Sequence, residues 1–311
     1  MLFTILIPVY NGSLTIRETL DSALSQEFRD FEVLVINDGS TDSTPEIVGE
    51  YCESYDNFRM ITKENGGTAS AYDLGTREAK GEFIVYGAAD DLLLPNNLRV
   101  HAEAIHKQPD FTVFCTNGYF FNTEEGWRTV ALKEKKWQKD HEVDLRSLTD
   151  SCILSPGCAF RARDGISVGG FSMGSLIEDY DLWLRFVLRG YRIWYSAQRT
   201  VMFRDSETQR SAAFMDMDVA KVQTLEKMLA LDGISSADQA IICAGIDSFL
   251  ATQQPAQDRQ NMVDQRKRLY AKVNKLPAWL RPITRALVSV LKPLARPFRR
   301  LMAAKRSERQ R

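Results

Sequence analysis

The segment FEVLVINDGSTDST, residues 31–44, decides the fold. Its first half is an apolar run rich in β-branched residues, which is typical of a strand buried in a parallel sheet. A polar turn around Gly39 follows, and Thr44-Pro45 then has the form of a helix N-cap and a first helical residue. Strand, turn and helix in this order predict one unit of an α/β sheet.

The same rhythm continues on both sides of this segment. Further strands are expected at TILIPVY (4–10), 58–62, EFIVYG (82–87), FTVFCTNGYFFN (111–122) and GCAFR (157–161). Alternating strands and helices predict a Rossmann-like, doubly wound and mostly parallel sheet in an α/β fold.

Capping signals mark the helices between these strands. Thr15 with Glu18 three residues later is expected to form a capping box, and a helix at 68–80 is expected to end at Gly81. Further helices are expected at about 177–188, 212–230, 236–252 and 257–274.

Polar clusters follow three of the predicted strands. They are Pro8-Val9-Tyr10-Asn11, the turn at Asp38, and the pair Asp90-Asp91. Ligands of open α/β sheets bind beyond the carboxyl ends of the strands. The three clusters are therefore expected to meet at one edge of the sheet.

Asp90 and Asp91 are two adjacent acids that follow an apolar strand. Their charges repel each other in an apolar setting, and a hard divalent cation removes that penalty. A solvated turn or a pair of N-cap residues is the structural alternative.

Glu178 and Asp179 open a predicted helix, where a carboxylate is stabilised by the helix dipole. They mark either a good helix start or a general base.

Five motifs occur in a fixed order: TILIPVYN, FEVLVINDGSTDST, KENGGTASAYDLG, AADDLLLP and GGF followed by EDYDLWLR. Together they resemble family 2 glycosyltransferases of the GT-A fold, over roughly residues 3–210. The resemblance implies a metal-dependent transferase that moves a sugar, with inversion, from a nucleotide-sugar donor. A UDP-sugar and a hexosyltransferase-type reaction are expected.

The resemblance also implies residue roles. Asp179 is the expected base, with Glu178 beside it in the catalytic pair. Mn²⁺ or Mg²⁺ is expected at Asp90 and Asp91. The expected donor-binding residues are Pro8, Val9, Tyr10, Asn11, Asp38, Gly67, Ala88, Ala89, Asp90 and Arg204.

Three positions depart from the family pattern. Ala88 stands where an acid usually begins the metal motif, and Tyr72 stands where a basic residue usually contacts the donor. No histidine follows Phe203-Arg204, so a third metal ligand is lacking there. Arg204 or Arg210 can neutralise the diphosphate instead.

The chain is predicted to have three parts. Residues 1–210 form the glycosyltransferase domain, with a nucleotide-binding half at 1–100 and an acceptor half at 101–210. Residues 211–265 form a helical extension, and residues 266–311 form a basic amphipathic tail. That tail has 15 Lys and Arg against one acid, so its formal charge of +14 leaves −15 on residues 1–265.

A basic amphipathic helix lies at the interface of an anionic leaflet. The tail therefore predicts an anionic membrane surface as a partner, with a docking helix or a disordered tail as alternatives. Together with the resemblance, it predicts a saccharide or lipid-linked saccharide acceptor and a role in bacterial surface polysaccharide synthesis. The expected place is the cytoplasm, peripheral on the inner face of the cell membrane. No signal peptide, spanning helix or disulfide framework is expected.

Two other functions stay open. A nucleotide-sugar-binding protein without transfer activity is favoured by Ala88 and the missing histidine. A nucleotidyltransferase usually has a basic glycine-rich loop after the first strand, and the loop at 11–15 has no basic residue. A nucleic-acid partner is not expected, because no aromatic binding platform accompanies the basic tail.

His101 and His106 are expected to be solvated, and Trp183 either packs or flanks the acceptor.

Overall fold

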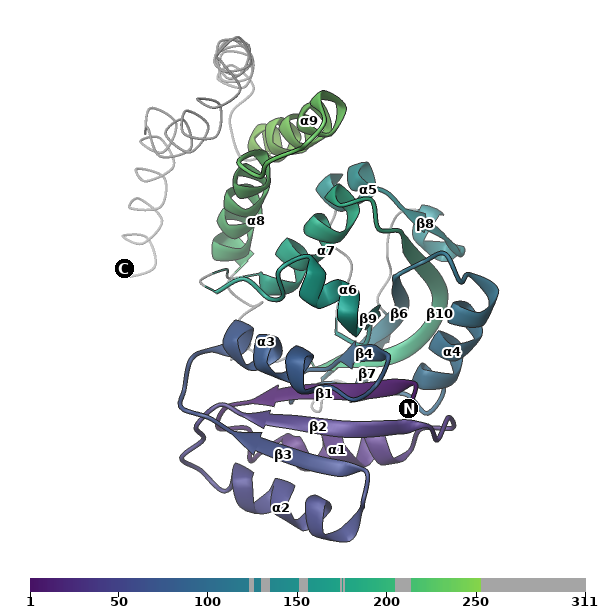
Figure 1. The fold of residues 1–311 in the computed structure, drawn as a ribbon, viewed down its shortest axis with the longest axis vertical. Helices are drawn as coiled ribbons and strands as arrows, with labels where there is room; N and C mark the ends of the chain where they lie inside the picture. Colours follow the sequence, from purple (N-terminus) through teal and green to yellow (C-terminus); the bar gives the residue numbers. More distant parts are fainter. Residues whose placement is uncertain are drawn as a thin grey trace. The chain divides into compact units, whose positions relative to one another are not determined.

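One mixed sheet organises the first part of the chain (Figure 1). The structure, a computed structural model, describes residues 1–122, 126–129, 135–150, 156–173, 175, 177–204 and 214–252. Within these ranges ten strands form the sheet in the order β3-β2-β1-β4-β9-β6-β10-β5, with β7 beside β6 and β8 beside β10. The strands are β1 (Phe3–Val9), β2 (Phe31–Asn37), β3 (Phe58–Thr62), β4 (Phe83–Tyr86), β5 (Leu92–Leu93), β6 (Val113–Asn122), β7 (Gly126–Thr129), β8 (His141–Val143), β9 (Ala159–Arg161) and β10 (Ile193–Arg204).

The first four strands are parallel to one another, and β6 is parallel to β10. Between them β9 runs antiparallel to both β4 and β6. The sheet is therefore a parallel half joined to a mixed half. The predicted α/β fold with a mostly parallel sheet is confirmed.

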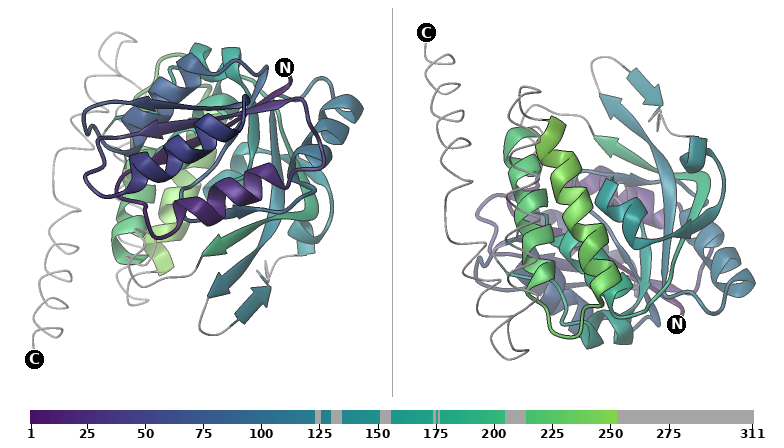
Figure 2. Two further views of the ribbon diagram at one scale, coloured as in Figure 1. Left: turned by 90° about the horizontal axis from the view of Figure 1, so that it is seen from below. Right: turned by 90° about the horizontal axis from the view of Figure 1, so that it is seen from above.

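Helices cover both faces of the sheet (Figures 1 and 2). In the first unit the helices are α1 (Ile16–Leu24), α2 (Thr44–Ser54), α3 (Thr68–Glu78), α4 (Asn97–Lys107), α5 (Leu145–Asp150), α6 (Ala162–Ser167) and α7 (Glu178–Leu188), with a 3₁₀ helix at Lys135–Gln138. Two more helices, α8 (Phe214–Leu229) and α9 (Ser236–Thr252), follow in the chain. On β1, Ile5 and Ile7 share a buried cluster with Ile16 and Leu20 of α1. Leu6 points to the other face, where it meets α3 at Gly75. A fully buried strand of this kind needs no polar alternation, which explains its apolar sequence.

The chain divides into two compact units, with the division between Lys221 and Val222. In the second unit the structure describes the end of α8 and all of α9. Leu225 and Met228 of α8 and Ile242 and Ile246 of α9 are buried apolar residues. None of the described helices is both long and apolar enough to cross a membrane. The basic tail, the helix expected at 257–274, and Arg210 lie outside the described residues.

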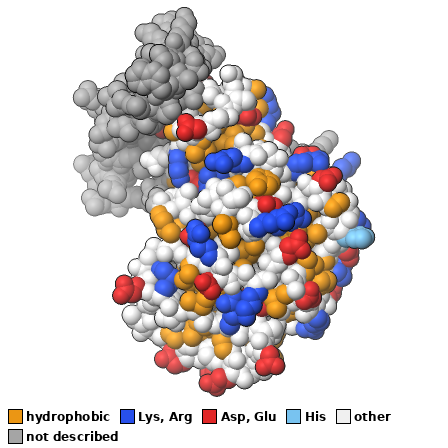
Figure 3. Space-filling view, viewed as in Figure 1, with side chains coloured by type: hydrophobic (Ala, Val, Ile, Leu, Met, Phe, Trp, Pro, Cys, Tyr) orange, Lys and Arg blue, Asp and Glu red, His pale blue; other side chains and the backbone are white. Residues whose placement is uncertain are grey.

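Charges of both signs are interspersed over the lower part of the face in Figure 3, which carries β1 to β3 and α2. Charged side chains also pair between helices: Arg17 of α1 and Glu50 of α2 lie 2.7 Å apart. This pair is about half exposed and contributes little to stability.

Three predicted helix caps are wrong. The N-cap of α2 is Ser43, one residue before the predicted Thr44. Thr15 stands at the N-cap of α1, but its hydroxyl donates to the Ala89 carbonyl at 2.8 Å and makes no capping bond. Glu18, the other half of the expected capping box, pairs with Arg204 instead. Helix α3 ends at Glu78, before Gly81, whose N–H donates to the Thr4 hydroxyl at 2.8 Å. A side chain at Gly81 would lie 2.4 Å from the backbone of β1, so close strand packing explains this glycine.

Candidate functional site

The loops after β1 and β2 are tied together by short polar side chains. The Asn11 carboxamide accepts the N–H of Thr41 at 2.8 Å, and the N–H of Asn11 donates to the Ser40 hydroxyl at 3.0 Å. Asn11 has a positive φ of 51°, a conformation that asparagine tolerates. Tyr10, before it, is half exposed. The predicted donor loop therefore has a fixed backbone and an accessible aromatic ring.

Asp42 reinforces this connection. Although burial alone would raise its pKa, hydrogen bonds from Thr44 and Ser13 lower the pKa of Asp42 to about 2. Its carboxylate accepts the Thr44 hydroxyl at 2.5 Å and the Ser13 N–H at 3.1 Å. The charged carboxylate thus joins the start of α2 to the turn before α1.

Asp38 is almost fully buried at the end of β2 and is surrounded by donors. Lys63 lies 2.5 Å from its Oδ1, which also accepts the Gly66 N–H at 3.0 Å. Its Oδ2 accepts the N–H of Gly67 at 2.8 Å. Gly67 has a φ of +83° at the N-cap of α3, so a side chain there would be strained. Asp38 therefore fixes the Lys63–Gly67 loop in front of α3. Each oxygen of its carboxylate can accept two hydrogen bonds.

The loop after β4 carries Ala88, Ala89 and the two adjacent acids. Its backbone is held by α1, because Thr15 and Thr19 both donate to the Ala89 carbonyl, at 2.8 and 3.0 Å. Thr19 also donates to the Asp91 carbonyl at 2.9 Å. The threonines of α1 therefore set the path of the loop, which explains why a polar residue such as Thr19 is buried.

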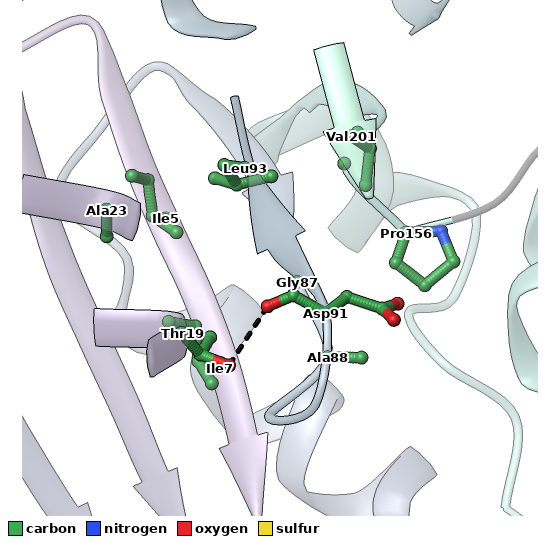
Figure 4. A pocket seen from close by; sticks show the side chains of 11 residues that line it. Ile5, Ile7, Thr19, Ala23, Gly87, Ala88, Asp91, Leu93, Pro156 and Val201 are labelled. Atoms are coloured by element: carbon green, nitrogen blue, oxygen red, sulfur yellow. Dashed lines mark hydrogen bonds between the residues drawn. The ribbon is translucent and has the colours of Figure 1, made fainter. Parts of the chain in front are cut away.

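Asp91 is 9% exposed and lies beside a small cavity of about 10 Å³ (Figure 4). The cavity is mainly apolar and is lined from β1, α1, the loop after β4, β5 and β10, for example by Ile5, Thr19 and Val201. Burial and the neighbouring Asp90 raise the pKa of Asp91 to about 8. Two negative charges on this pair of acids are thus strongly unfavourable unless a cation compensates them.

Arg204, the last residue of β10, binds this acidic loop from the other side. Its N–H donates to Asp91 Oδ1 and its Nε donates to the Asp90 carbonyl, both at 3.0 Å. The guanidinium also pairs with Glu18 and stacks 4.6 Å from the centre of the Phe121 ring. Arg204 is therefore a structural bridge between the acidic loop and α1.

Asp179 lies in the first turn of α7 and is half-buried. Its Oδ1 accepts the Tyr180 N–H at 2.7 Å, and its Oδ2 accepts the hydroxyl of Tyr86 at 3.3 Å. Glu178, beside it, is buried. Tyr86 ends β4, and Asp90 follows four residues later, which limits their Cα separation to roughly 14 Å. The candidate base is thus connected, through the side chain of Tyr86, to the strand that leads into the candidate metal ligands.

A buried ion pair supports the start of α7. Arg185 lies 2.6 Å from Asp181, and it also donates to the carbonyls of Val168 and Gly170, both at 2.6 Å. Gly169 and Gly170 both have positive φ, so Arg185 stabilises the turn that precedes the helix. Sequence reasoning missed this pair, although its i,i+4 spacing of opposite charges was visible in EDYDLWLR.

His101 differs from its predicted surroundings, whereas Trp183 follows one of the two alternatives predicted for it. His101 is fully buried rather than solvated, and its Nε2 lies 2.8 Å from the Gly157 carbonyl, whereas His106 is exposed as expected. Trp183 is also fully buried, so it packs and does not line an acceptor surface. Tyr72, in place of the family's basic residue, donates to the Gly87 carbonyl at 2.7 Å and stacks on Phe171.

The predicted residues converge as expected at the carboxyl edge of β1, β2 and β4. The order of these strands places β1 between the other two, and the Asp38 N–H donates to the Val9 carbonyl at 2.9 Å. Pro8 and Val9 are buried in β1 and Tyr10 follows it. Across the described ranges no group of three or more His, Cys, Asp or Glu side chains is placed to hold a metal ion. Asp90 and Asp91 offer two adjacent carboxylates.

The family model for Glycosyl transferase family 2 matches residues 4–167, more than half of the chain. The chain belongs to this family. An uncharacterized glycosyltransferase of Rickettsia typhi is 32% identical over 223 residues, which cover 68% of this chain and 67% of that one. Four further Rickettsia relatives are matched over only 27–58% of their length. Glycosyltransferase GlyA of Streptococcus pneumoniae is 32% identical over 124 residues, 40% of this chain and 18% of that one.

Solved structures agree with the fold. S. aureus TarS 1-349 superposes with a TM-score of 0.66 at 22% identity, over 94% of this chain and 81% of that one. A mannosyltransferase from Pyrobaculum calidifontis, solved with GDP-Man and Mn²⁺, gives a TM-score of 0.61 at 18% identity, over 94% and 86% of the two chains. The family 2 chain therefore has the GT-A fold that its motifs predicted.

Proposed function

We propose that this family 2 chain is an inverting glycosyltransferase that uses a nucleotide-sugar donor. The observation that carries the proposal is the hydrogen bond between Tyr86, at the end of β4, and Asp179. It joins the candidate base to the strand that leads into Asp90 and Asp91. A base on one side and acidic metal ligands on the other are what a single displacement at a sugar carbon requires.

In this mechanism Asp179 accepts the proton of the acceptor hydroxyl. The acceptor oxygen then forms a bond to the anomeric carbon, while the bond from that carbon to the diphosphate oxygen breaks. The electron pair leaves with the nucleoside diphosphate, and attack opposite the leaving group inverts the configuration. Glu178, which is buried beside Asp179, is proposed to complete the catalytic pair.

The donor is proposed to lie along the carboxyl edge of the sheet. Tyr10 and Asn11 form one side, and Pro8, Val9, Ala88 and Ala89 contribute the backbone of the strand ends. Asp38, with Gly67 held against it, is proposed to accept a hydrogen bond from the base of the nucleotide. A UDP-sugar is the proposed donor. TarS has been solved with UDP and with UDP-GlcNAc, which supports this choice by analogy of fold.

Asp90 and Asp91 are proposed to hold Mn²⁺ or Mg²⁺. The donor set fits such an ion, because these cations take one or two carboxylates and complete their shell with water and phosphate oxygens. Asp91, buried beside a second acid, also gains most from a cation. When bound, the ion supplies Lewis-acid stabilisation of the charge that grows on the departing diphosphate. Arg204 orients both acids through its N–H and Nε.

The acceptor is proposed to be a saccharide, lipid-linked, in bacterial surface polysaccharide synthesis. The supporting feature is the +14 charge of residues 266–311, which favours an anionic membrane surface. The proposed location is the inner face of the cell membrane. Replacing Arg296, Arg299 and Arg300 with Gln in the full chain should weaken sedimentation with anionic vesicles at least threefold. Equal sedimentation of both proteins would contradict a membrane-binding tail.

The central experiment measures UDP release from a panel of UDP-sugars with Mn²⁺, together with the thermal stability of the protein with each donor. Asp179→Asn should lower turnover about 1000-fold while donor affinity stays within threefold. The exposed Asp110 provides the matched control, and Asp110→Asn should retain full turnover. Stabilisation by a donor without turnover in the unaltered chain would favour the binding protein over the enzyme. Absence of stabilisation by any nucleotide sugar would reject both.

A further inference from the structure

Tyr86 occupies a rigid position between the two halves of the sheet. Its hydroxyl is the donor to Asp179 Oδ2, and its side chain is only 1% exposed. The N–H of Tyr86 donates to the Cys158 carbonyl at 3.1 Å, and its own carbonyl accepts the Gly157 N–H at 2.7 Å. On the other side, β4 is paired with β1. The backbone below the ring is therefore fixed from both sides.

Aromatic neighbours fix the ring itself. The centre of the Trp183 ring lies 5.4 Å away, and Tyr72 packs against Tyr86 edge to face at 5.8 Å. Both neighbours are buried, and the hydroxyl of Tyr72 is bound to the Gly87 carbonyl. Because these rings leave little freedom for rotation, the hydroxyl of Tyr86 stays directed at α7.

The carboxylate of Asp179 is thus held at both oxygens. The Tyr180 N–H binds Oδ1 and the Tyr86 hydroxyl binds Oδ2. Burial and the nearby Asp179 charge raise the pKa of Tyr86 well above its ordinary value. The hydroxyl therefore remains protonated at neutral pH and donates to the carboxylate. The other titratable groups that act on Tyr86 are Cys158, Tyr72 and Cys115, and Glu178 adjoins the carboxylate in the sequence.

We propose that Tyr86 is a positioning residue for the transfer reaction, whose hydroxyl orients the Asp179 carboxylate and sets its basicity. This role rests on the proposed function of Asp179 as the base. A hydrogen bond to the charged form of an acid favours that form. Tyr86 keeps its own proton throughout, and the proton of the acceptor hydroxyl ends on Asp179. Because Tyr86 is buried, it acts through Asp179 and does not touch the substrate.

The test is Tyr86→Phe, which removes one oxygen and keeps the ring. Loss of a hydrogen bond to a charged group corresponds to about one pH unit, so the acidic limb of the pH profile of kcat/KM should move up by about one unit. We expect kcat to fall about tenfold and the KM for the donor to stay within twofold. Tyr195→Phe is the matched control, because its buried hydroxyl donates to the Trp137 carbonyl at 3.2 Å and not to Asp179. Its pH profile should equal that of the unaltered chain.

Two outcomes separate this inference from the proposed function. If Asp179→Asn abolishes transfer but the pH profile of Tyr86→Phe is unshifted in a protein with an unchanged melting transition, the positioning role is wrong and the base is retained. If Asp179→Asn still transfers sugar, the proposed base itself is wrong. A fall in activity of Tyr86→Phe through KM alone, without a pH shift, would also reject the positioning role.

Discussion

The ammonium group of Lys63 lies 2.5 Å from the carboxylate of Asp38 and 2.6 Å from the carbonyl of Glu64. Lys63→Met would leave a nearly buried carboxylate with only its two backbone donors. We expect the free energy of unfolding to fall by about 1–3 kcal/mol, as measured by urea denaturation. Lys80→Met, at an exposed lysine, should change it by less than about 0.5 kcal/mol. Equal effects of the two changes would show that Asp38 does not depend on Lys63.

Arg204 offers a test of the acidic loop. Arg204→Lys removes the Nε that binds the Asp90 carbonyl but keeps the positive charge beside Glu18. With UDP present, the Mn²⁺ concentration for half-maximal thermal stabilisation should rise at least fivefold, because the ligands are less well oriented. Arg199→Lys serves as the control, since Arg199 is exposed and stacks only on Tyr119. An unchanged Mn²⁺ midpoint for Arg204→Lys would contradict the orienting role.

His101 predicts how stability depends on pH. Burial lowers its pKa to about 4, whereas in the unfolded chain it has its ordinary value of 6.5. As the pH falls, the unfolded state therefore takes up a proton at His101 before the folded state does. The contribution of the neutral His101 to stability is fully present above pH 6.5 and is lost as the pH drops toward 4. The loss from this one group amounts to at most about 3 kcal/mol.

Denaturation of His101→Gln and His106→Gln across pH 4–7 checks this expectation. The His101→Gln protein should lose part of the pH dependence, because it has no proton to take up at this site. His106 is exposed and serves as the control, and His106→Gln should follow the unaltered chain. The assignment to His101 fails if all three curves run parallel.

Two glycines inside helices should respond to alanine with opposite sign. A Cβ at Gly75 of α3 would lie 2.1 Å from Leu6, whereas nothing lies within 4 Å of a Cβ at Gly49 of α2. Gly75→Ala should therefore destabilise by about 1–3 kcal/mol through overpacking. Gly49→Ala should stabilise by about 0.5–1 kcal/mol through helix propensity. Thermal unfolding of both variants measures this, and stabilisation by Gly75→Ala would show that α3 can move away from β1.

The sequence predicted the strands better than their connections. For β1, β2 and β4 the expected and observed bounds differ by about one residue, because these strands are buried on both faces and read as apolar runs. For β3, which is only partly buried, the bounds agree. The two-residue strand β5 and the short α6 were missed, since segments of this length carry no periodicity. The 12-residue strand β10 was missed as well, although it is long.

The errors at the site have one physical cause. Thr15, Glu18 and His101 were interpreted from their sequence neighbours, but each is satisfied by a residue more than 50 positions away. The convergence of Asp38 and Asp90 was predictable, because it follows from parallel strands sharing an edge. The contact of Tyr86 with Asp179 was not, since it depends on how α7 packs against β4.

The place of β9 in the sheet has a consequence for synthesis of the chain. During translation β1 to β4 emerge first and are joined by near neighbours, but the free edge of β4 is paired only when β9, residues 159–161, has left the ribosome. An unpaired apolar strand edge is a site of misassociation. For about 75 residues of elongation the nascent chain therefore exposes the edge of β4, the strand that contains Tyr86. During this interval the chain has most need of protection by a chaperone.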